Sequence, residues 1–512
     1  MADPVDVVMF DTTLRDGEQT PGVGFSVQDK VALALKLEEL NVDVIEAGFP
    51  INSEEEKDAV RQISDAVRNS QVCGLARVVD IDIDTAIECG VDMVHVFAPT
   101  SEVQMAHAVH STPEKIVQKS RAAIQKIKDA GLICMFSPMD ATRTDPDFLI
   151  EICQIAEEAG ADWLNLPDTV GVGTPQSIQA MVNRVRAKVS TAISIHCHND
   201  FGMGVANSLT AVEAGATMVQ VSVNGIGERA GNASLEQTVM CLHCLYEQFN
   251  VKIKTENLYE ISRFVERLTG IPTPPPQPII GANAFSHESG IHAAGVIEEA
   301  STFEPGIMTP EMVGHKRRLV IGKHTGTHSV EIALHEAGLI PDKDELMEIV
   351  RRVKSLGGKG KHVTQTDLFT IAESVMAKVP KDQRAIELDQ LVVTTGNKTT
   401  PTASVVARIN GETRTEAQLG VGPVDAALKA VQRILGDSPK LEVTGFHMDA
   451  ISGGSDAVAT VLITVEDESG KRSSAQGAGE DITIASVEAL IAAINQLLRI
   501  RAHSEETAEV AN

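Results

Sequence analysis

Two histidines separated by a single residue carry the clearest chemical signal in the sequence. His196 and His198 follow a short β-prone apolar run, Ala192–Ile195, so on an extended chain both imidazoles project to the same side. An isolated His-x-His is more often a chance pair in which one histidine belongs to the core. Here the pair leads directly into the polar turn Asn199-Asp-Phe-Gly202, where a strand should give way to a helix. This position favours a pair of metal ligands.

The elements that position this pair form a regular strand–helix repeat through the first half of the chain. Short apolar, β-branched runs alternate with amphipathic helical patterns such as Gln28–Leu40 and Pro113–Ala130. Eight such units of about thirty residues each predict an α/β fold, a (β/α)8 TIM barrel rather than an open doubly wound sheet. The runs are Val7–Phe10, Val42–Glu46, Val72–Ala76, Met93–Phe97, Ile133–Phe136, Trp163–Leu166, Ile193–Ile195 and Val219–Val223.

In a barrel of this kind the active site lies where the strands end, and those positions are rich in polar side chains. Asp11, Thr12 and Asp168 suit ordinary turn or cap roles, which we take as their default. The glycines of Asn224–Asn232 lack the spacing of a dinucleotide loop and indicate a turn in which the backbone approaches a neighbouring group closely. The remaining candidates are Arg15, Asp16, Glu46, His95, Ser137, Thr169, His196, His198 and Asn232.

Two histidines, one carboxylate and an amide oxygen make a mixed nitrogen and oxygen site. Such a site suits Zn²⁺, Mn²⁺ or Mg²⁺ and does not choose among them. A 2-oxo acid can chelate a divalent metal through its carboxylate and ketone oxygens, and the ion then polarises the ketone. Arg15, next to Asp16, can share the stabilisation of a developing alkoxide. A structural ion pair between Arg15 and Glu46 is the alternative, and the two roles are compatible.

Five motifs in barrel order resemble the α-isopropylmalate synthase and homocitrate synthase family, the Claisen-condensing DRE-TIM metallolyases. The resemblance covers nearly the whole chain. The motifs are Phe10-Asp-Thr-Thr-Leu-Arg-Asp-Gly-Glu-Gln-Thr20, Ile45-Glu-Ala-Gly-Phe-Pro50, Asn165-Leu-Pro-Asp-Thr-Val-Gly171, His196-Cys-His-Asn-Asp200 and Asn224-Gly-Ile-Gly-Glu-Arg-Ala-Gly-Asn232.

The resemblance implies an acyltransferase that uses acetyl-CoA as co-substrate. A proton leaves the acetyl-CoA methyl group, the enolate adds to the ketone of a 2-oxo acid, and the thioester is hydrolysed. The implied residue roles are a divalent metal held by Asp16, His196, His198 and Asn232, Arg15 on the substrate carbonyl, Glu46 orienting Arg15, and His95, Ser137 and Thr169 contacting the 2-oxo acid. His292, at the end of Asn283-Ala-Phe-Ser-His-Glu-Ser-Gly-Ile-His292, matches the catalytic histidine of the family.

The second half of the chain suggests further domains. A proline-rich linker, Pro272–Pro278, follows the barrel. Small-residue loops near the C-terminus resemble the regulatory domain of isopropylmalate and citramalate synthases, which implies a homodimer inhibited by an end-product amino acid, leucine. We expect a catalytic barrel over 1–270, a linker and subdomain over the barrel mouth at 271–325, a helical subdomain at 326–387, a C-terminal α/β regulatory domain at 388–500 and a disordered tail at 501–512.

Composition narrows the partners and the compartment. A formal charge of −27 argues against nucleic acid and anionic membranes, because phosphate binding needs a basic surface. Neither a membrane-spanning run nor a signal peptide is evident. Seven cysteines without regular spacing indicate reduced thiols and a cytoplasmic protein, with Cys241 and Cys244 as core residues. The basic segments His315–Arg318 and Gly322–Gly326 are either a solvated face or a site for a phosphate-bearing ligand.

Two positions depart from the family pattern. Met139, in Phe136-Ser-Pro-Met-Asp140, replaces a glutamate that works with the loop histidine, and methionine cannot accept a proton. Either Asp140 or a water replaces that glutamate, or His292 acts alone, or the chain is slow or inactive. Phe303 stands where relatives commonly carry a tyrosine.

Four alternatives remain beside a 2-oxoisovalerate-condensing, leucine-inhibited enzyme. A citramalate synthase would take pyruvate and respond to isoleucine, and one methylene-scale difference in an apolar pocket is worth only about 1–3 kcal/mol. A homocitrate-type enzyme would need an extra cation, for which Arg77 and Arg143 are candidates. A catalytically impaired amino-acid sensor would follow from Met139. A lyase of the hydroxymethylglutaryl-CoA type would not need the C-terminal domain.

Overall fold

The structure is a computed structural model of the 512-residue chain. It falls into two compact units, Met1–Ser286 with Glu304–Arg318, and His287–Phe303 with Leu319–Asn512. The described residues are 4–289, 292, 295–296, 298–319, 325–337, 339–358, 363–376, 384–409, 411–436, 441–450, 458–479 and 481–510.

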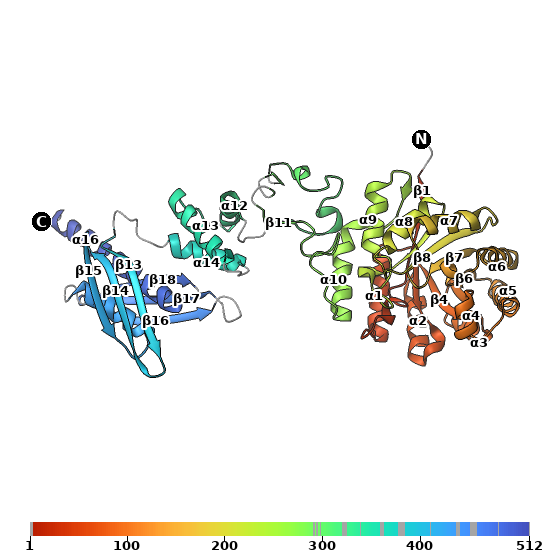
Figure 1. Ribbon diagram of the computed structural model, residues 1–512, viewed down its shortest axis with the longest axis horizontal. Helices are drawn as coiled ribbons and strands as arrows, with labels where there is room; N and C mark the ends of the chain where they lie inside the picture. Colours follow the sequence, from red (N-terminus) through yellow and green to blue (C-terminus); the bar gives the residue numbers. More distant parts are fainter. Residues whose placement is uncertain are drawn as a thin grey trace. The chain divides into compact units, whose positions relative to one another are not determined.

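The first unit is a closed barrel of eight parallel strands in chain order, which confirms the predicted TIM barrel (Figure 1). Every predicted apolar run overlaps one strand. The last strand stops at Val221, two residues before the predicted end, because a turn with a left-handed Asn224 (φ 60°) begins there. The strands are β2 (Val8–Asp11), β3 (Val44–Gly48), β4 (Gln71–Arg77), β5 (Met93–Pro99), β6 (Ile133–Met139), β7 (Trp163–Asp168), β8 (Ala192–Cys197) and β9 (Met218–Val221).

Helices surround the barrel strands (Figure 1). Their starts are set by local signals: Ser26 forms a capping box with Asp29, and Thr112 accepts the Lys115 amide with Pro113 at the first turn. The helices are α1 (Val27–Glu39), α2 (Glu54–Ala66), α3 (Asp80–Glu88), α4 (Glu102–His107), α5 (Pro113–Asp129), α6 (Pro146–Ala159), α7 (Pro175–Arg186), α8 (Gly204–Glu213), α9 (Leu235–Leu245) and α10 (Leu258–Thr269).

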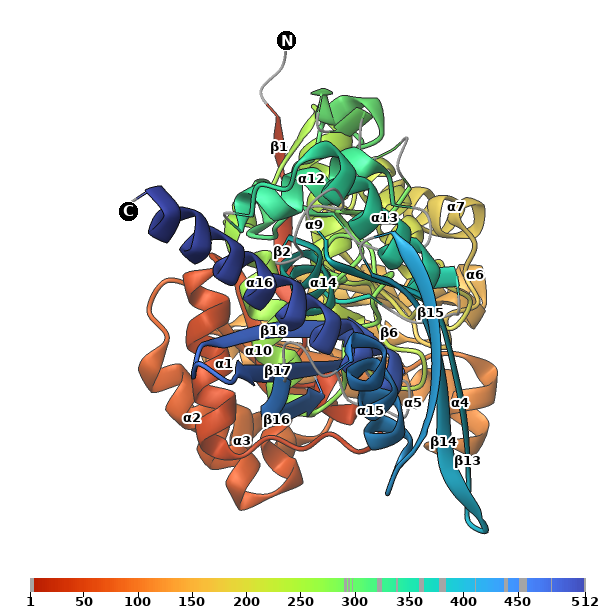
Figure 2. The same ribbon diagram turned by 90° about the vertical axis from the view of Figure 1, so that its left-hand side faces the viewer.

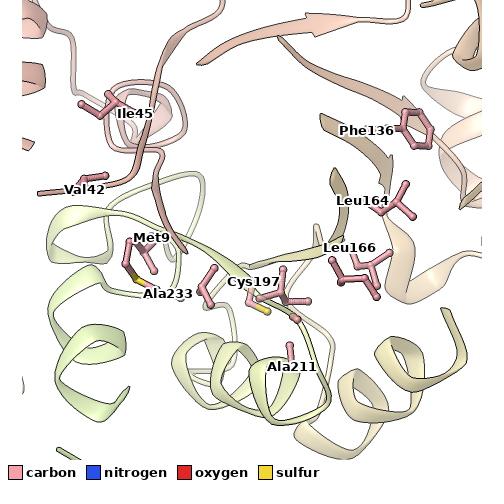
Figure 3. Packing of buried hydrophobic residues seen from close by; sticks show 14 of the residues in the cluster. Met9, Val42, Ile45, Phe136, Leu164, Leu166, Cys197, Ala211 and Ala233 are labelled. Carbon is pink, nitrogen blue, oxygen red and sulfur yellow. The ribbon is translucent and has the colours of Figure 1, made fainter. Parts of the chain in front are cut away.

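The main core lies between the barrel strands and these helices. Figure 3 shows the side chains of Leu164, Leu166 and Cys197 on barrel strands and of Ala211 on a surrounding helix. All four are buried. Because side chains alternate along a strand, the residues between them face the barrel interior. Asn165 and His196 are therefore interior residues, and this alternation places polar chemistry inside the barrel.

In its described residues, the second unit carries helices α12 (Thr327–Glu336), α13 (Lys343–Gly358) and α14 (Gln365–Met376), and after them two three-stranded antiparallel sheets with two further helices. The sheets belong to two successive βββα halves. The first helix, α15, packs on β14 and β15, and the second, α16, lies across β17 and β18 (Figure 2). The elements of the halves are β13 (Ile386–Gly396), β14 (Thr399–Ile409), β15 (Glu412–Leu419) and α15 (Pro423–Leu435), then β16 (Leu441–Ala450), β17 (Ala459–Asp467), β18 (Arg472–Gly479) and α16 (Ile482–Val510).

The predicted disordered tail at 501–512 is wrong up to Val510. Helix α16 continues through Arg501 to Val510. The segment Arg501–Val510 is polar, but half of it is alanine and glutamate, which have high helix propensity, and it contains neither glycine nor proline.

The structure also bears on the cysteines, the basic region and the expectation about membrane-spanning segments. All seven cysteines are free; Cys241 and Cys244 are half-buried on α9, and Cys244 packs against the main core. In the basic region, Arg317 is paired with Glu304 at 2.7 Å, and the segment 320–324 lies outside the described residues. Among the described residues, no helix combines the length and apolar character that crossing a membrane requires.

Candidate metal and substrate site

Three potential metal ligands meet at the carboxyl ends of the barrel strands. The ligand atoms of Asp16, His196 and His198 all lie within 4.8 Å of one another. Each histidine Nε2 is 3.9 Å from Asp16 Oδ2, and each of the three side chains is buried. Asn232 joins them, because its Nδ2 donates to Asp16 Oδ1 at 2.9 Å. The structure thus brings together the four residues that the sequence predicted as ligands.

Glycines allow this close approach. Gly227 and Gly231 both have positive φ angles, and a Cβ on Gly227 would collide with the Asn232 carboxamide and lie 2.7 Å from Asp16 Oδ1. A Cβ on Gly231 would collide with the carbonyl of Gly225. The loop after β9 therefore serves as a turn of close approach that brings Asn232 against Asp16.

The donor set fits a divalent cation. His196 Nδ1, His198 Nδ1 and Asn232 Oδ1 are buried without a hydrogen-bond partner among the described residues. Burial, and then repulsion from His198, lowers the pKa of His196 to about 3, and burial also lowers the pKa of His198. Burial works against the Asp16 carboxylate, but Arg15 and the two histidines outweigh it and hold the Asp16 pKa well below its ordinary value. Neutral imidazoles and an ionised carboxylate are the forms that bind a metal.

Arg15 is held beside this set by two carboxylates. Its Nε donates to Glu46 Oε2 at 2.7 Å and its Nη1 to Asp16 Oδ2 at 2.6 Å. Thr12 Oγ1 also donates to Glu46 Oε2, at 2.6 Å. Burial alone would raise the pKa of Glu46, but Arg15 and His95 lower it to about 2. Glu46 therefore acts as an acceptor that fixes the guanidinium.

A hydrogen-bonded chain continues from Glu46 across the barrel. Glu46 Oε1 lies 2.7 Å from His95 Nδ1, and His95 Nε2 lies 2.6 Å from Ser137 Oγ. An ionised carboxylate only accepts, so His95 Nδ1 is the donor of that pair. Asn165 Nδ2 donates to Ser137 Oγ at 2.7 Å. Thr169 Oγ1 accepts the backbone N–H of Asp140 at 2.9 Å, which leaves the Thr169 hydroxyl proton for another acceptor.

These side chains surround a cavity of about 280 Å³. Its lining combines the predicted residues Arg15, Asp16, His95, His196 and His198 with apolar side chains. The complete lining is Arg15, Asp16, Gln19, Phe49, Leu75, His95, Phe97, Ser137, Met139, Asn165, Pro167, Thr169, His196, His198, Gln220, Glu228 and Arg229.

Met139 lines this cavity, whereas the neighbouring Asp140 turns away from it. Asp140 has a left-handed backbone (φ 70°) and a fully buried side chain. Its carboxylate accepts from Ser101 Oγ at 2.5 Å and from Arg143 Nη2 at 2.6 Å. The idea that Asp140 replaces the missing glutamate is therefore wrong, because its acceptor oxygens are already engaged outside the cavity.

The two arginines proposed for a homocitrate-type site are also engaged elsewhere. Arg77 donates to Asp82 at 2.6 Å, Arg143 pairs with Asp140, and neither lines the cavity. His292 belongs to the second unit, where it is exposed and stacked on Phe303 with ring centroids 4.2 Å apart. Its role in the chemistry stays a prediction.

Several lining residues were missed by the sequence reasoning. Asn165 lies inside one of the quoted motifs, and its place two residues before Pro167 on one strand was a usable signal for an interior position. Gln220, inside the apolar run of the last strand, gave a similar signal through the same alternation. The default structural role of Asp168 fits, since its carboxylate accepts the Gly173 amide at 2.9 Å and the Thr142 hydroxyl at 2.9 Å.

Comparison with known proteins places the chain. The HMGL-like family matches residues 6–265, the homocitrate synthase post-HMGL domain-like family residues 279–361, and the LeuA allosteric (dimerisation) domain residues 362–498. A probable 2-isopropylmalate synthase of Archaeoglobus fulgidus is 52% identical over 96% of this chain and 97% of its own length. The 2-isopropylmalate synthase of Methanocaldococcus jannaschii is 48% identical over 97% and 96%. The (R)-citramalate synthase of that organism is 43% identical over 96% and 99%. The chain belongs to the HMGL-like family, in the group of full-length relatives that carry 2-isopropylmalate synthase and (R)-citramalate synthase names.

Proposed function

We propose that the protein is a 2-isopropylmalate synthase, which condenses acetyl-CoA with 2-oxoisovalerate to give 2-isopropylmalate and CoA, the first committed step of leucine biosynthesis. The observation that carries the proposal is the cavity, in which a metal-ligand set and Arg15 share a lining with an apolar wall. Relatives of that name are 48–52% identical over nearly the full chain, whereas the (R)-citramalate synthase is 43% identical.

The polar side of the cavity suits the 2-oxo acid head group. Asp16, His196, His198 and Asn232 would hold a divalent metal, which supplies Lewis acidity toward the ketone when bound. Arg15 has N–H groups beyond those given to Glu46 and Asp16, and these donate to the ketone oxygen as negative charge develops there. Thr169 offers its hydroxyl proton to the substrate carboxylate, and Ser137, held by His95 and Asn165, contacts the 2-oxo acid.

The apolar side of the cavity suits a branched alkyl group. Phe49, Leu75, Phe97, Met139 and Pro167 contribute apolar surface. A 2-oxoglutarate substrate would need a cation for its second carboxylate, and the two candidate arginines are paired away from the cavity. The apolar lining therefore favours 2-oxoisovalerate over 2-oxoglutarate. An isopropyl group contacts more of this lining than the methyl group of pyruvate does, which favours 2-oxoisovalerate over pyruvate.

Proton removal from the acetyl group needs a base that Met139 cannot supply. We assign that step to His292, on the resemblance of the segment Asn283–His292 to the family motif. Asp140 does not contribute, because Ser101 and Arg143 hold its carboxylate. The assignment predicts turnover that depends on His292 alone.

The C-terminal half suggests regulation. The LeuA allosteric (dimerisation) domain match supports a homodimer and an amino-acid effector, and the proposed product pathway makes leucine that effector. Seven free thiols suit a reducing compartment, so we propose a cytoplasmic enzyme.

The test is a substrate panel on the purified, metal-loaded protein. Release of free CoA thiol from acetyl-CoA is measured with 2-oxoisovalerate, pyruvate or 2-oxoglutarate, each with and without leucine. The proposal predicts the highest kcat/KM for 2-oxoisovalerate and inhibition by leucine. A preference for pyruvate would make the protein a citramalate synthase, and no release with any acid would favour an amino-acid sensor.

A further inference from the structure

Three buried polar groups inside the barrel have no assigned role. Asn165 Oδ1, Ser194 Oγ and Gln220 Oε1 lack a hydrogen-bond partner in the part of the chain that the structure describes. Their residues are 1%, 0% and 1% exposed. Buried polar atoms are nearly always hydrogen bonded, so three of them on neighbouring strands indicate a shared polar ligand.

The strand register brings these groups to the metal ligand His196. Asn165 pairs with Ser194 between β7 and β8, and His196 pairs with Gln220 between β8 and β9. Ser194 and His196 are two residues apart, so they face the same side of their strand. Asn165, His196 and Gln220 all line the cavity, which fixes that side as the interior.

The position of Gln220 supports the same grouping. Its Nε2 lies 3.2 Å from Met135 Sδ, which belongs to β6 on the other side of β7 and β8. The Gln220 side chain therefore crosses the interior in front of those two strands. Asn165 and Ser194 are interior residues of β7 and β8, so they belong to the face of these strands that the Gln220 side chain crosses.

His196 needs an acceptor at this place. Its Nε2 faces Asp16 Oδ2 at 3.9 Å, and its Nδ1 is buried without a partner among the described residues. A metal-ligating histidine almost always donates its second ring N–H to a carbonyl, a carboxylate or a water. Two carboxamide oxygens can only accept hydrogen bonds, and a water can connect them to a donor.

We propose that Gln220 and Asn165 are positioning residues of the metal site, which together with Ser194 hold one buried water that accepts the Nδ1–H of His196. The water donates its two hydrogens to the carboxamide oxygens of Gln220 and Asn165. It accepts from His196 Nδ1 and from the Ser194 hydroxyl. This arrangement gives His196 Nδ1, the Ser194 hydroxyl and the two carboxamide oxygens one hydrogen-bond partner each. It also keeps the imidazole lone pair of His196 on Nε2, the nitrogen that faces Asp16.

The same water connects the metal ligands to the substrate side of the cavity. Asn165 Nδ2 donates to Ser137 Oγ at 2.7 Å, so the Asn165 carboxamide orients the Ser137 hydroxyl in the cavity and also supports His196. The inference rests on the metal site of the proposed function, and its test therefore measures metal binding rather than turnover.

The test is Zn²⁺ affinity of the full chain, measured by competition with a chromophoric chelator. Gln220→Met keeps the side-chain length and removes the acceptor, and we expect it to weaken Zn²⁺ binding by about 10- to 100-fold. Gln220→Glu retains an acceptor and should bind Zn²⁺ at least as tightly as the wild type. Met135→Leu is the matched control, because it removes the sulfur next to Gln220 Nε2 and leaves Oε1 in place; its affinity should be unchanged.

If Gln220→Met lowers the melting temperature of the metal-free protein, a second variant tests the inference without that loss of stability. Ser194→Ala removes one partner of the water with little change in volume and should weaken binding several-fold at an unchanged melting temperature. Wild-type affinity in both Gln220→Met and Ser194→Ala would overturn the inference and leave the metal site intact. A wild-type protein that binds no divalent ion would overturn the metal site, and the inference with it.

Discussion

The Arg15 guanidinium and the Glu46 carboxylate form a buried ion pair, with Nε 2.7 Å from Oε2 and the Glu46 side chain fully buried. Glu46 uses its other oxygen for His95, at 2.7 Å. One carboxylate thus fixes both a cation beside the metal ligands and the histidine that orients Ser137. This relationship makes Glu46 the link between the two halves of the polar lining.

Replacing Glu46 should therefore damage turnover more than folding. In Glu46→Gln the shape is kept but the charge that orients Arg15 is lost, and we expect kcat to fall by about 100-fold. CoA release at saturating substrate measures the effect. Asp43→Asn is the control, because Asp43 lies just before β3, the strand that carries Glu46, and its carboxylate accepts the Met9 amide at 2.9 Å. A Glu46→Gln variant with the kcat of the control would contradict the orienting role.

Asn232 should contribute directly to metal affinity. Its Oδ1 is buried without a partner among the described residues, while its Nδ2 donates to Asp16. Asn232→Ala removes that oxygen and should weaken Zn²⁺ or Mn²⁺ binding by about tenfold or more. Asn232→Asp, the matched variant, keeps an oxygen at the same place. Equal affinities of Asn232→Ala and the wild type would show that the amide is not a ligand.

The metal site should tolerate mild acid. Protons compete with a metal only below the pKa that a histidine has in the metal-free protein. Burial lowers the pKa of His196 to about 3 and holds that of His198 below its ordinary value. Apparent affinity should therefore fall less between pH 8 and pH 6 than it would with two ordinary histidines. A histidine with an ordinary pKa of about 6.5 would by itself weaken binding about fourfold at pH 6.

Competition titrations at several pH values measure this behaviour. A site in which both histidines titrate normally would lose more than tenfold between pH 8 and pH 6, and that outcome would contradict the burial argument. Chelator treatment at pH 8 should abolish CoA release, and added divalent ion should restore it.

Phe97 should help to select the alkyl group. It lines the cavity next to Phe49, with ring centroids 6.3 Å apart. Phe97→Ala removes apolar wall that an isopropyl group would contact and pyruvate would reach less. We expect the ratio of kcat/KM for 2-oxoisovalerate to that for pyruvate to fall by about tenfold or more. An unchanged ratio would mean that the alkyl group lies elsewhere.

Met139 offers a gain-of-function test. The side chain lines the cavity, and Asp140 beside it is held by Ser101 and Arg143. Met139→Glu introduces the carboxylate that the family resemblance implies at this position, and we expect kcat to rise by about tenfold or more. Met139→Gln is the control, since an amide of the same shape is not a base. No difference between the two variants would mean that a carboxylate at this position takes no part in proton removal.

The barrel could be predicted from sequence because each strand is a short apolar run bounded by polar turns. The spacing of His196 and His198 was sufficient to place both imidazoles on one side of a strand. The metal-ligand set also needed Asp16 and Asn232, which are far apart in sequence, and only the family resemblance connected them.

The remaining features depend on contacts that a sequence does not display. Asp140 was one of several alternatives for the missing glutamate, but its left-handed backbone turns the carboxylate toward Ser101 and Arg143. Gln220 sits within an apolar run, and its position across the interior is visible only through its contact with Met135. The tail after Arg501 was expected to be disordered because it is polar, yet its helix propensity carries α16 to Val510.

The most direct measurement is CoA release by the metal-loaded protein with 2-oxoisovalerate and with pyruvate at matched concentrations. The account predicts faster release with 2-oxoisovalerate, because its isopropyl group fills the apolar wall formed by residues such as Leu75 and Phe97. Faster release with pyruvate, or no release with either acid, would contradict it.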